Sequence, residues 1–254
     1  MLDAASGELA CGTTGKGRMQ EIDVLLAAAE YALTPKTLAG QHVLITAGPT
    51  HEAIDPVRYI TNASTGKMGY ALARACLKRG AQVTLVSGPS QISLRAWEAF
   101  APITIWPVLS AADMCQTTLQ AFDQADISIL CAAVADFTPT NTAEHKIKKQ
   151  PGQTSMTLEM TTTTDIAATL GQNKRSDQRL IGFALETHDE MHNAQRKLQS
   201  KNLDMIVLNS LQDAGAGFGT DTNKVTLLYA DGTKKDLPLL SKQEVADYII
   251  DQII

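Results

Sequence analysis

Long apolar stretches and targeting signals are missing from this sequence of 254 residues. No run of eighteen apolar residues occurs, so we expect no helix that crosses a membrane. The N-terminal stretch MLDAASGELACG has neither a basic start nor a long apolar segment, and is therefore not typical of a signal peptide. The four cysteines, Cys11, Cys76, Cys115 and Cys131, form no CxxC pair. In a chain without a secretory signal, this spacing indicates reduced thiols and a cytoplasmic protein.

The sequence also has fewer basic than acidic residues. It contains 22 Lys and Arg residues and 27 Asp and Glu residues, which gives a net charge of −5. This balance argues against nonspecific binding to nucleic acid. Any anionic ligand must instead be held by local lysines and backbone amides. Glycine fingerprints are missing as well, because the first apolar run is followed by TAGPTHEA, which is neither GxGxxG nor a Walker sequence.

The sequence does contain short, β-rich apolar runs that alternate with helical patterns. Runs that are apolar throughout and alternate with helices predict a parallel sheet covered on both faces. We therefore expect an α/β, Rossmann-like doubly wound domain with a mostly parallel sheet. The expected strands are 42–48, 82–88, 103–108, 127–134, 180–186 and 204–209, and the expected helices are 21–33, 67–80, 111–125, 165–174, 188–202 and 241–254. Residues 224–239 carry Asp231-Gly232 between two strand-like runs and predict a late β-hairpin.

The connection at 48–69 is unusually long for a strand-to-helix loop, which normally takes two to six residues. In doubly wound sheets, ligands bind beyond the carboxyl ends of strands. Residues Ser64, Thr65, Gly66, Lys67 and Gly69 would place hydroxyls, amides and an ammonium at a helix N-terminus, which suits a phosphate. A plain N-cap explains the hydroxyls equally well.

Several motifs in the same order resemble one family. They are TAGPTHEAIDPVRYITNASTGKMGYALA, CAAVADF (131–137), KIKK (146–149), TTDI (163–166), GFALET (182–187) and KNLD (201–204). Over residues 40–254 the chain thus resembles bacterial phosphopantothenoylcysteine synthetase, the ligase part of a bifunctional enzyme of coenzyme A biosynthesis. The segment ASGELACGTTGKGRM (5–19) looks like the end of the flavin-dependent decarboxylase often fused before this ligase, with Cys11 as its active-site cysteine.

The resemblance implies a division into a decarboxylase remnant at 1–20, a linker and helix at 21–40, and a ligase domain at 41–254. FMN would belong only to a decarboxylase domain that this chain lacks. The implied reaction joins 4′-phosphopantothenate to L-cysteine, using CTP and Mg²⁺ or Mn²⁺, through an acyl-cytidylate. The implied assembly is a homodimer, and a higher oligomer when the decarboxylase is fused. Neither nucleic acid nor a membrane is an expected partner.

Two residues would be catalytic by this resemblance. Asn62 matches the family's catalytic Asn, whose neutral amide can donate to an acyl oxygen, although Asn before Ser-Thr-Gly is also a common turn residue. Lys146 matches the essential lysine at the start of the KIKK motif, in a polar loop that in the family reaches the site of a second protomer. Without the resemblance, a lysine run usually forms a solvated face, and Lys148 and Lys149 could act only by steering.

The remaining expected contacts fall into two groups. Phosphopantothenate would contact Gly48, Ser64, Thr65, Gly66, Lys67, Met68, Gly69 and Ala132. CTP would contact Ala132, Ala133, Asp136, Lys146, Thr164, Asp165, Ile166, Ala167, Phe183, Lys197 and Lys201, with Asp136 as the candidate metal ligand. The family usually has a second Ser at Thr65 and Asn-Pro at Thr163-Thr164. Capping, core packing and solvated faces are the structural explanations that compete with these roles.

The sequence is also compatible with two other functions. The Rossmann pattern alone would favour a nucleotide-sugar or dinucleotide reductase, but such an enzyme needs a glycine fingerprint after the first strand and an acidic residue about 20 residues later. A nucleotide sensor without catalysis is the second alternative. The presence of both Asn62 and Lys146 argues against it.

Overall fold

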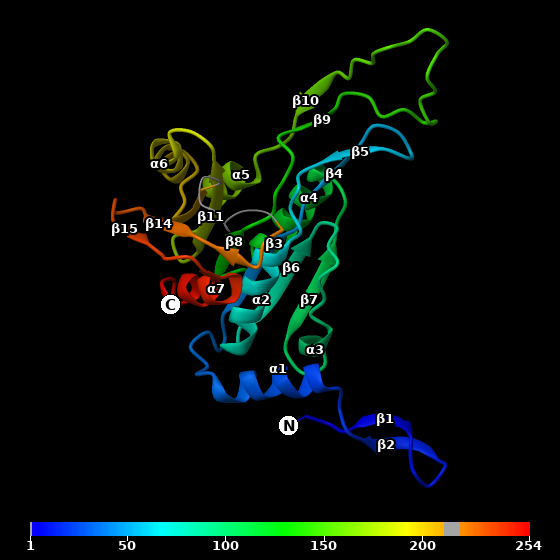
Figure 1. The fold of residues 1–254 in the computed structure, drawn as a ribbon. Coiled ribbons are helices and arrows are strands. Elements are labelled where there is room, and N and C mark those ends of the chain that lie inside the picture. The colour runs from blue at the N-terminus through cyan, green and yellow to red at the C-terminus, as the bar shows by residue number, and fades with distance from the viewer. Residues whose placement is uncertain (1, 211–218) are drawn as a thin grey trace.

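The computed structural model describes residues 2–210 and 219–254, and its centre is an eight-stranded sheet (Figure 1). The strand order is β15-β14-β12-β11-β8-β3-β6-β7. The six strands from β12 to β7 are parallel, while β14 and β15 add an antiparallel edge. The bounds are β3 (His42–Ala47), β6 (Gln82–Ser87), β7 (Ile103–Pro107), β8 (Ile127–Leu130), β11 (Arg179–Glu186), β12 (Met205–Ser210), β14 (Val225–Tyr229) and β15 (Lys234–Asp236). This arrangement confirms the doubly wound α/β fold.

The chain begins the sheet in its middle. It runs from β3 outward to β6 and β7, and then returns to β8 on the other side of β3. The strand order therefore reverses between β3 and β8, and ligands of such sheets bind beyond the carboxyl ends of the strands at this point.

Helices cover both faces of the sheet because β3 is apolar on both sides. Val43 and Ile45 pack into the core formed with α2 (Lys67–Lys78) and α7 (Lys242–Asp251). Leu44 points to the opposite core, which includes residues of α4 (Ala111–Phe122), α5 (Ile166–Asn173) and α6 (Glu190–Ser200). Val43, Leu44 and Ile45 are all fully buried.

Helices α2 and α7 lie side by side with their C-terminal ends joined by ion pairs. Arg79, directly after α2, contacts Asp247 at 2.7 Å and Asp251 at 2.6 Å. Lys78 contacts Asp247 at 2.7 Å. Because these contacts join the ends of both helices, the first residues of the two helices lie at the same end of the pair.

Two expected elements differ from the observed ones. The strand expected at 127–134 ends at Leu130, because residues 131–135 turn to run beside residues 46–50. The long connection at 48–66 is partly folded as a hairpin of β4 (His51–Ala53) and β5 (Tyr59–Thr61). The expected late hairpin is confirmed, with β14 pairing with β15 around Asp231-Gly232.

Several short elements were not expected because their sequences are polar or brief. The ribbon of β9 (Phe137–Pro139) and β10 (Met160–Thr162) carries a long loop that extends away from the sheet (Figure 1). The others are β1 (Ala5–Glu8), β2 (Thr14–Arg18), α3 (Arg95–Glu98), β13 (Thr222–Asn223) and β16 (Leu240–Ser241). The expected N-terminal helix is present as α1 (Ile22–Leu33). Within the described part of the chain, no helix has the length and apolar character needed to span a bilayer.

Candidate functional site

Two neighbouring pockets lie at the switch point of the sheet. We call them the α2 pocket and the α5 pocket, after the helix whose N-terminus lines each one. Their volumes are about 290 Å³ and about 410 Å³, and Ala132, Val134 and Phe183 line both. The α2 pocket is lined by Asn62, Ser64, Thr65, Gly66, Lys67, Met68, Gly69, Cys131, Ala132, Ala133, Val134, Phe183, Ala184, Leu185, Asn209, Gly219, Asn223 and Lys242. Two ligands bound in these pockets would therefore meet at a shared wall.

The N-terminus of α2 forms the floor of the α2 pocket. Gly66 caps the helix with φ of 82°, in the left-handed region that favours glycine. A Cβ at position 66 would lie only 3.3 Å from the Cα of Gly48. Because the first N–H groups of a helix have no intrahelical partner, the N–H groups that begin α2 suit an anion.

Gly48 supports the site without lining either pocket. Its carbonyl accepts a hydrogen bond from the N–H of Ala133 at 2.9 Å. The N–H of Ala132 donates to the Thr46 hydroxyl at 3.2 Å, and that of Ala135 donates to the Thr50 hydroxyl at 3.0 Å. These bonds hold the segment after β8 against the segment after β3 and so fix the shared wall.

Asn62, the residue that follows β5, reaches this wall from the side of the hairpin. Its Nδ2 donates to the carbonyls of Ala133 at 3.0 Å and Val134 at 3.2 Å. The donor that we expected to face the substrate's acyl oxygen is thus bonded to the backbone in this structure. Asn62 thus holds Val134, which lines both pockets, and its neighbour Ala133, which lines the α2 pocket.

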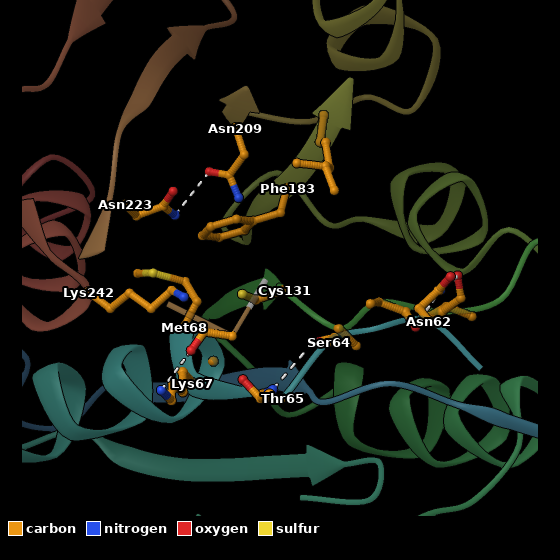
Figure 2. A pocket seen from close by; sticks show the side chains of 18 residues that line it. Asn62, Ser64, Thr65, Lys67, Met68, Cys131, Phe183, Asn209, Asn223 and Lys242 are labelled. Carbon is orange, nitrogen blue, oxygen red and sulfur yellow. Dashed lines mark hydrogen bonds between the residues drawn. The ribbon is translucent and has the colours of Figure 1, made fainter. Parts of the chain in front are cut away.

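The α2 pocket also contains residues that the sequence analysis missed. Lys242 is the first residue of α7, and it is 8% exposed. Asn223 is buried and donates to Oδ1 of Asn209 at 3.2 Å. Figure 2 shows these side chains on the side of the pocket away from Asn62. Asn209 follows an apolar run at the carboxyl end of a parallel strand, and this position was the available signal; nothing in the local sequence marks Lys242 or Asn223.

The α5 pocket brings together most of the residues expected to contact a nucleotide. Its lining residues are Thr46, Leu130, Ala132, Val134, Ala135, Asp136, Phe137, Thr162, Thr163, Thr164, Asp165, Ile166, Ala167, Gly182, Phe183, Lys197, Lys201, Leu203 and Ile206. Lys197 and Lys201 reach one pocket, as their spacing of four residues predicted. Ala133 lines the α2 pocket instead.

Three charged side chains of the α5 pocket, Asp165, Lys197 and Lys201, have charged partners. Asp165 caps α5 by accepting from the N–H of Ala168 at 3.0 Å and contacts Lys201 at 2.8 Å. Burial acts to raise the pKa of Asp165, but the bonds from Lys201 and the Ala168 N–H outweigh it and lower the pKa. Lys197 contacts Glu186 at 2.6 Å. A nucleotide phosphate would therefore enter a site in which the lysines already have carboxylate partners.

Asp136 lies at the start of the β9–β10 ribbon and lines the α5 pocket. No group of three or more His, Cys, Asp or Glu residues suited to a metal ion occurs in the described ranges 2–210 and 219–254. Mg²⁺ is commonly bound through one or two carboxylates together with substrate phosphates. The donor set therefore fits a metal that arrives with a nucleotide rather than a site built by the protein alone.

Lys146 lies outside the lining of both pockets. Its loop joins β9 to β10 and is attached at its base to the β4–β5 hairpin. The N–H of Ala143 donates to the carbonyl of Ile54 at 3.0 Å, and the N–H of Ile147 donates to Asp55 at 3.1 Å. The structure thus holds Lys146 next to the hairpin and away from the pockets of its own chain.

Cys11 is also remote from both pockets. It lies exposed between β1 and β2, where its Sγ is 3.1 Å from the Thr13 hydroxyl. Contact with Thr13 lowers the pKa of the Cys11 thiol. Cys131, which lines the α2 pocket, differs, because burial raises its pKa to about 12.

The chain is similar to known proteins of one family. Residues 38–254 match the model of the DNA/pantothenate metabolism flavoprotein C-terminal domain. The chain is 50% identical over 255 residues to the coenzyme A biosynthesis bifunctional protein CoaBC of Bacillus subtilis (strain 168), covering 99% of this chain and 61% of that protein. It is 49% identical to a cysteine/cysteine sulfinic acid decarboxylase of an unknown prokaryotic organism, covering 100% of this chain and 70% of that protein.

A solved structure of the C-terminal domain of a CoaBC protein matches as well. The TM-score is 0.69 at 43% identity, and the match covers 85% of this chain and 95% of that domain. The chain therefore spans almost the whole of that domain but only about three fifths (61%) of the Bacillus subtilis relative.

Proposed function

Because this chain belongs to the family of the DNA/pantothenate metabolism flavoprotein C-terminal domain, we propose that it is a phosphopantothenate–cysteine ligase that uses CTP. Its relatives include bifunctional proteins of coenzyme A biosynthesis. The observation that carries the proposal is the pair of pockets that share the wall formed by Ala132, Val134 and Phe183. A ligase that activates one substrate with another needs two such adjoining sites.

The proposed reaction has two steps. A carboxylate oxygen of 4′-phosphopantothenate attacks the α-phosphorus of CTP, and pyrophosphate leaves. The amine of cysteine then attacks the acyl carbon, CMP leaves with the bonding electrons, and the amine loses a proton. Bringing the reactants together in a fixed orientation supplies much of the rate enhancement in reactions of this kind.

The α2 pocket is the proposed site of phosphopantothenate. Its phosphate would lie at the N-terminus of α2, near Lys67, and its carboxylate would point to the shared wall. The α5 pocket is the proposed CTP site, with Lys197 and Lys201 toward the phosphates. Mg²⁺ or Mn²⁺ would be held by Asp136 and the triphosphate, where it would offset charge on the phosphate oxygens.

The two proposed catalytic residues act differently. Asn62 positions the wall by bonding to the carbonyls of Ala133 and Val134, and an acyl oxygen arriving there would compete for the same amide donors. Lys146 would act in the site of a second protomer, since it does not line a pocket of its own chain. A homodimer is therefore part of the proposal. Its test is light scattering, and a fully active monomer would overturn it.

Pyrophosphate release with CTP and 4′-phosphopantothenate, measured without cysteine, tests the function. A burst close to one pyrophosphate per site is expected, with amide product formed only after cysteine is added. ATP in place of CTP tests nucleotide choice in the same assay. A protein that binds CTP and releases no pyrophosphate would be a nucleotide sensor, and the ligase proposal would fail.

A further inference from the structure

A further cavity lies between α1, α2 and α3, apart from the two pockets at the switch point. Its volume is about 290 Å³, close to the lower limit for small-molecule sites. None of its lining residues lines the α2 pocket or the α5 pocket. Figure 1 shows α1 next to α3, at the end of the molecule opposite the loop between β9 and β10. The cavity is therefore separate from the proposed ligase site.

Apolar contacts hold α1 over this cavity. Ala27 on α1 is 3% exposed and packs in the same core as Trp97 of α3, and both residues line the cavity. One turn further along α1, the ring of Tyr31 contacts Phe100 edge to face, with the ring centroids 5.7 Å apart. The gap between the helices is thus framed by packed side chains and has an apolar floor.

The walls of the cavity carry opposite charges. α1 supplies Asp23 and Glu30, which lie on the helix face of Ala27 because they are four residues before it and three residues after it. Arg74 on α2 and Arg95, the first residue of α3, line the cavity from the other helices. One wall is therefore acidic and the other basic.

These opposite charges do not pair with one another. In the ranges 2–210 and 219–254, neither Arg74 nor Arg95 has a carboxylate oxygen within 4.0 Å. Nε of Arg74 is buried, and no hydrogen-bond acceptor among the described residues reaches it. Burying a charged donor without an acceptor costs free energy, so Arg74 would gain from a carboxylate that enters the cavity.

The charges on both walls restrict the kind of ligand. An anion alone would satisfy the arginines but would also approach the two carboxylates of α1. A cation alone would meet the arginines. A molecule with both charges meets a partner on each wall, and guanidinium groups bind carboxylates through two parallel hydrogen bonds. Ser93 adds a hydroxyl to the lining, and its Oγ accepts from the N–H of Arg95 at 3.1 Å.

We propose that this cavity binds a small zwitterion, an α-amino acid with an apolar side chain. Its carboxylate would accept hydrogen bonds from Arg74 and Arg95, and its ammonium group would contact Asp23 or Glu30. Its side chain would pack on Trp97. Such a ligand would join α1 to α2 and α3, at a site distinct from the two pockets of the proposed ligase.

Three ligands that differ in charge test this inference. L-Leucine carries both charges, L-leucine methyl ester lacks the carboxylate, and 4-methylpentanoate lacks the ammonium group. Calorimetry would measure their binding to the wild type, Arg74→Met, Arg95→Met, Glu30→Gln and Arg196→Met. Met keeps most of the apolar stem of Arg and removes its charge. Arg196 is exposed on α6 and lines none of these three cavities, so its variant is the matched control for loss of one guanidinium.

The wild type should bind L-leucine about tenfold to a hundredfold more tightly than either analogue, as expected for charged hydrogen bonds. Arg74→Met should abolish most of the preference over the methyl ester. Arg95→Met, at an exposed position, should lower the same preference without a change in folding. Glu30→Gln should instead lower the preference over 4-methylpentanoate, and Arg196→Met should keep both preferences.

The inference fails if Arg74→Met and Arg95→Met both leave the preference over the methyl ester unchanged. L-Leucine would then bind elsewhere, for example where the proposed ligase takes cysteine. Equal affinity for the three ligands, or no binding of L-leucine to the wild type at millimolar concentration, would also overturn it. Pyrophosphate release from CTP should be unchanged in Arg74→Met, so this inference and the proposed function fail in different assays.

Discussion

The carboxylate of Asp55 accepts a hydrogen bond from the N–H of Ile147, 92 residues further along the chain, at 3.1 Å. Arg58 completes the contact, since its Nε donates to Asp55 at 3.1 Å and its Nη2 donates to the carbonyl of Ile147 at 3.0 Å. The Asp55 side chain is fully buried. Through these bonds, the hairpin that leads to Asn62 also fixes the base of the loop that carries Lys146.

Loosening this contact should expose the loop to proteolysis. In Asp55→Asn, the new NH₂ group would face either the Arg58 guanidinium and the N–H of Ile147, which both donate to Oδ2, or the backbone N–H groups of Val57 and Arg58, which both donate to Oδ1. At least two hydrogen bonds are lost in either orientation. We expect trypsin to cleave after the lysines at 146–149 roughly tenfold faster than in the wild type, the equivalent of one charged hydrogen bond. Mass spectrometry of timed digests would measure the rate at each site.

Asp177→Asn is the control for that digest, because Asp177 pairs with Arg175 at an exposed position, with 71% of its side chain accessible. It should leave the cleavage rate unchanged. Equal rates in the wild type and Asp55→Asn would show that the loop is held by other contacts.

The same aspartate predicts a pH dependence of stability. The Arg58 guanidinium, helped by the N–H groups of Val57 and Ile147, holds the pKa of Asp55 well below its usual value despite burial. A pKa that is lower in the folded state stabilises the protein above the unfolded pKa, and this stabilisation is lost as pH falls toward the folded pKa. The stability difference between wild type and Asp55→Asn should thus be constant from about pH 7 to about pH 5 and shrink below about pH 4. Urea unfolding at several pH values measures it, and a difference that grows on acidification would contradict the assignment.

The proposed roles of Lys146 and Asn62 separate the two steps of the reaction. Lys146→Gln should slow acyl-cytidylate formation by roughly a hundredfold or more. The phosphate oxygens gain negative charge in this step, and the variant removes the ammonium group that would stabilise it. Asn62→Asp should still release pyrophosphate, while the amide product falls and the acyl-cytidylate accumulates, because a carboxylate would oppose the developing oxyanion. Quenched single turnovers with mass spectrometry measure both.

Asn62→Ala serves as the matched variant in this experiment. It loses the bonds to Ala133 and Val134, as Asn62→Asp does, but adds no charge. If the two Asn62 variants lose amide formation equally, the cause would be the lost hydrogen bonds to the segment after β8 rather than the added charge. If Asn62→Asp blocks acyl-cytidylate formation as completely as Lys146→Gln does, the proposed division of roles is wrong.

Asp165 combines a cap with a proposed nucleotide contact, and two substitutions separate them. Asp165→Ala should cost about 1 kcal/mol of stability, because α5 loses its N-cap. Asp165→Ser keeps a capping hydroxyl and should preserve the melting temperature, yet bind CTP about tenfold more weakly because a charged acceptor is lost. Calorimetry with CTP measures this. Unchanged or tighter binding in Asp165→Ser would limit Asp165 to capping α5 and pairing with Lys201.

The cysteines should react with thiol reagents in a fixed order. Cys11 is exposed and its contact with Thr13 lowers its pKa, so it should react first. Burial raises the pKa of Cys76 and of Cys131 to about 12, so roughly one thiol in ten thousand is ionised at pH 8. Burial also raises the pKa of Cys115. Ellman's reagent should titrate one thiol in the native protein and four after unfolding.

Cys11→Ser should abolish the fast reaction with the reagent and leave ligation unchanged, since Cys11 lines neither pocket. A second fast thiol in the native protein would contradict the burial of the other cysteines. A large loss of ligation would show that Cys11 takes part in this reaction.

The sequence alone determined the doubly wound sheet and one half of the site. Buried parallel strands must be apolar on both faces, so each central strand left a continuous run such as HVLITA in the sequence. Helix N-termini also leave local signals, and Gly66 and Asp165 are the caps observed at the two pockets. These features depend on residues close together in the chain, and periodicity and capping chemistry therefore reveal them.

Only the tertiary structure decided which distant residues meet. Lys242 lines the same pocket as Lys67 because α7 packs beside α2, and Ile147 reaches Asp55 because the β9–β10 loop folds back onto the β4–β5 hairpin. It also decided that the amide of Asn62 bonds to the backbone after β8. Each contact joins segments separated by 71 or more residues, and no local pattern of hydrophobicity or turn residues records such a pairing. Packing of whole elements fixes these distances, and so it decides which described residues line each pocket.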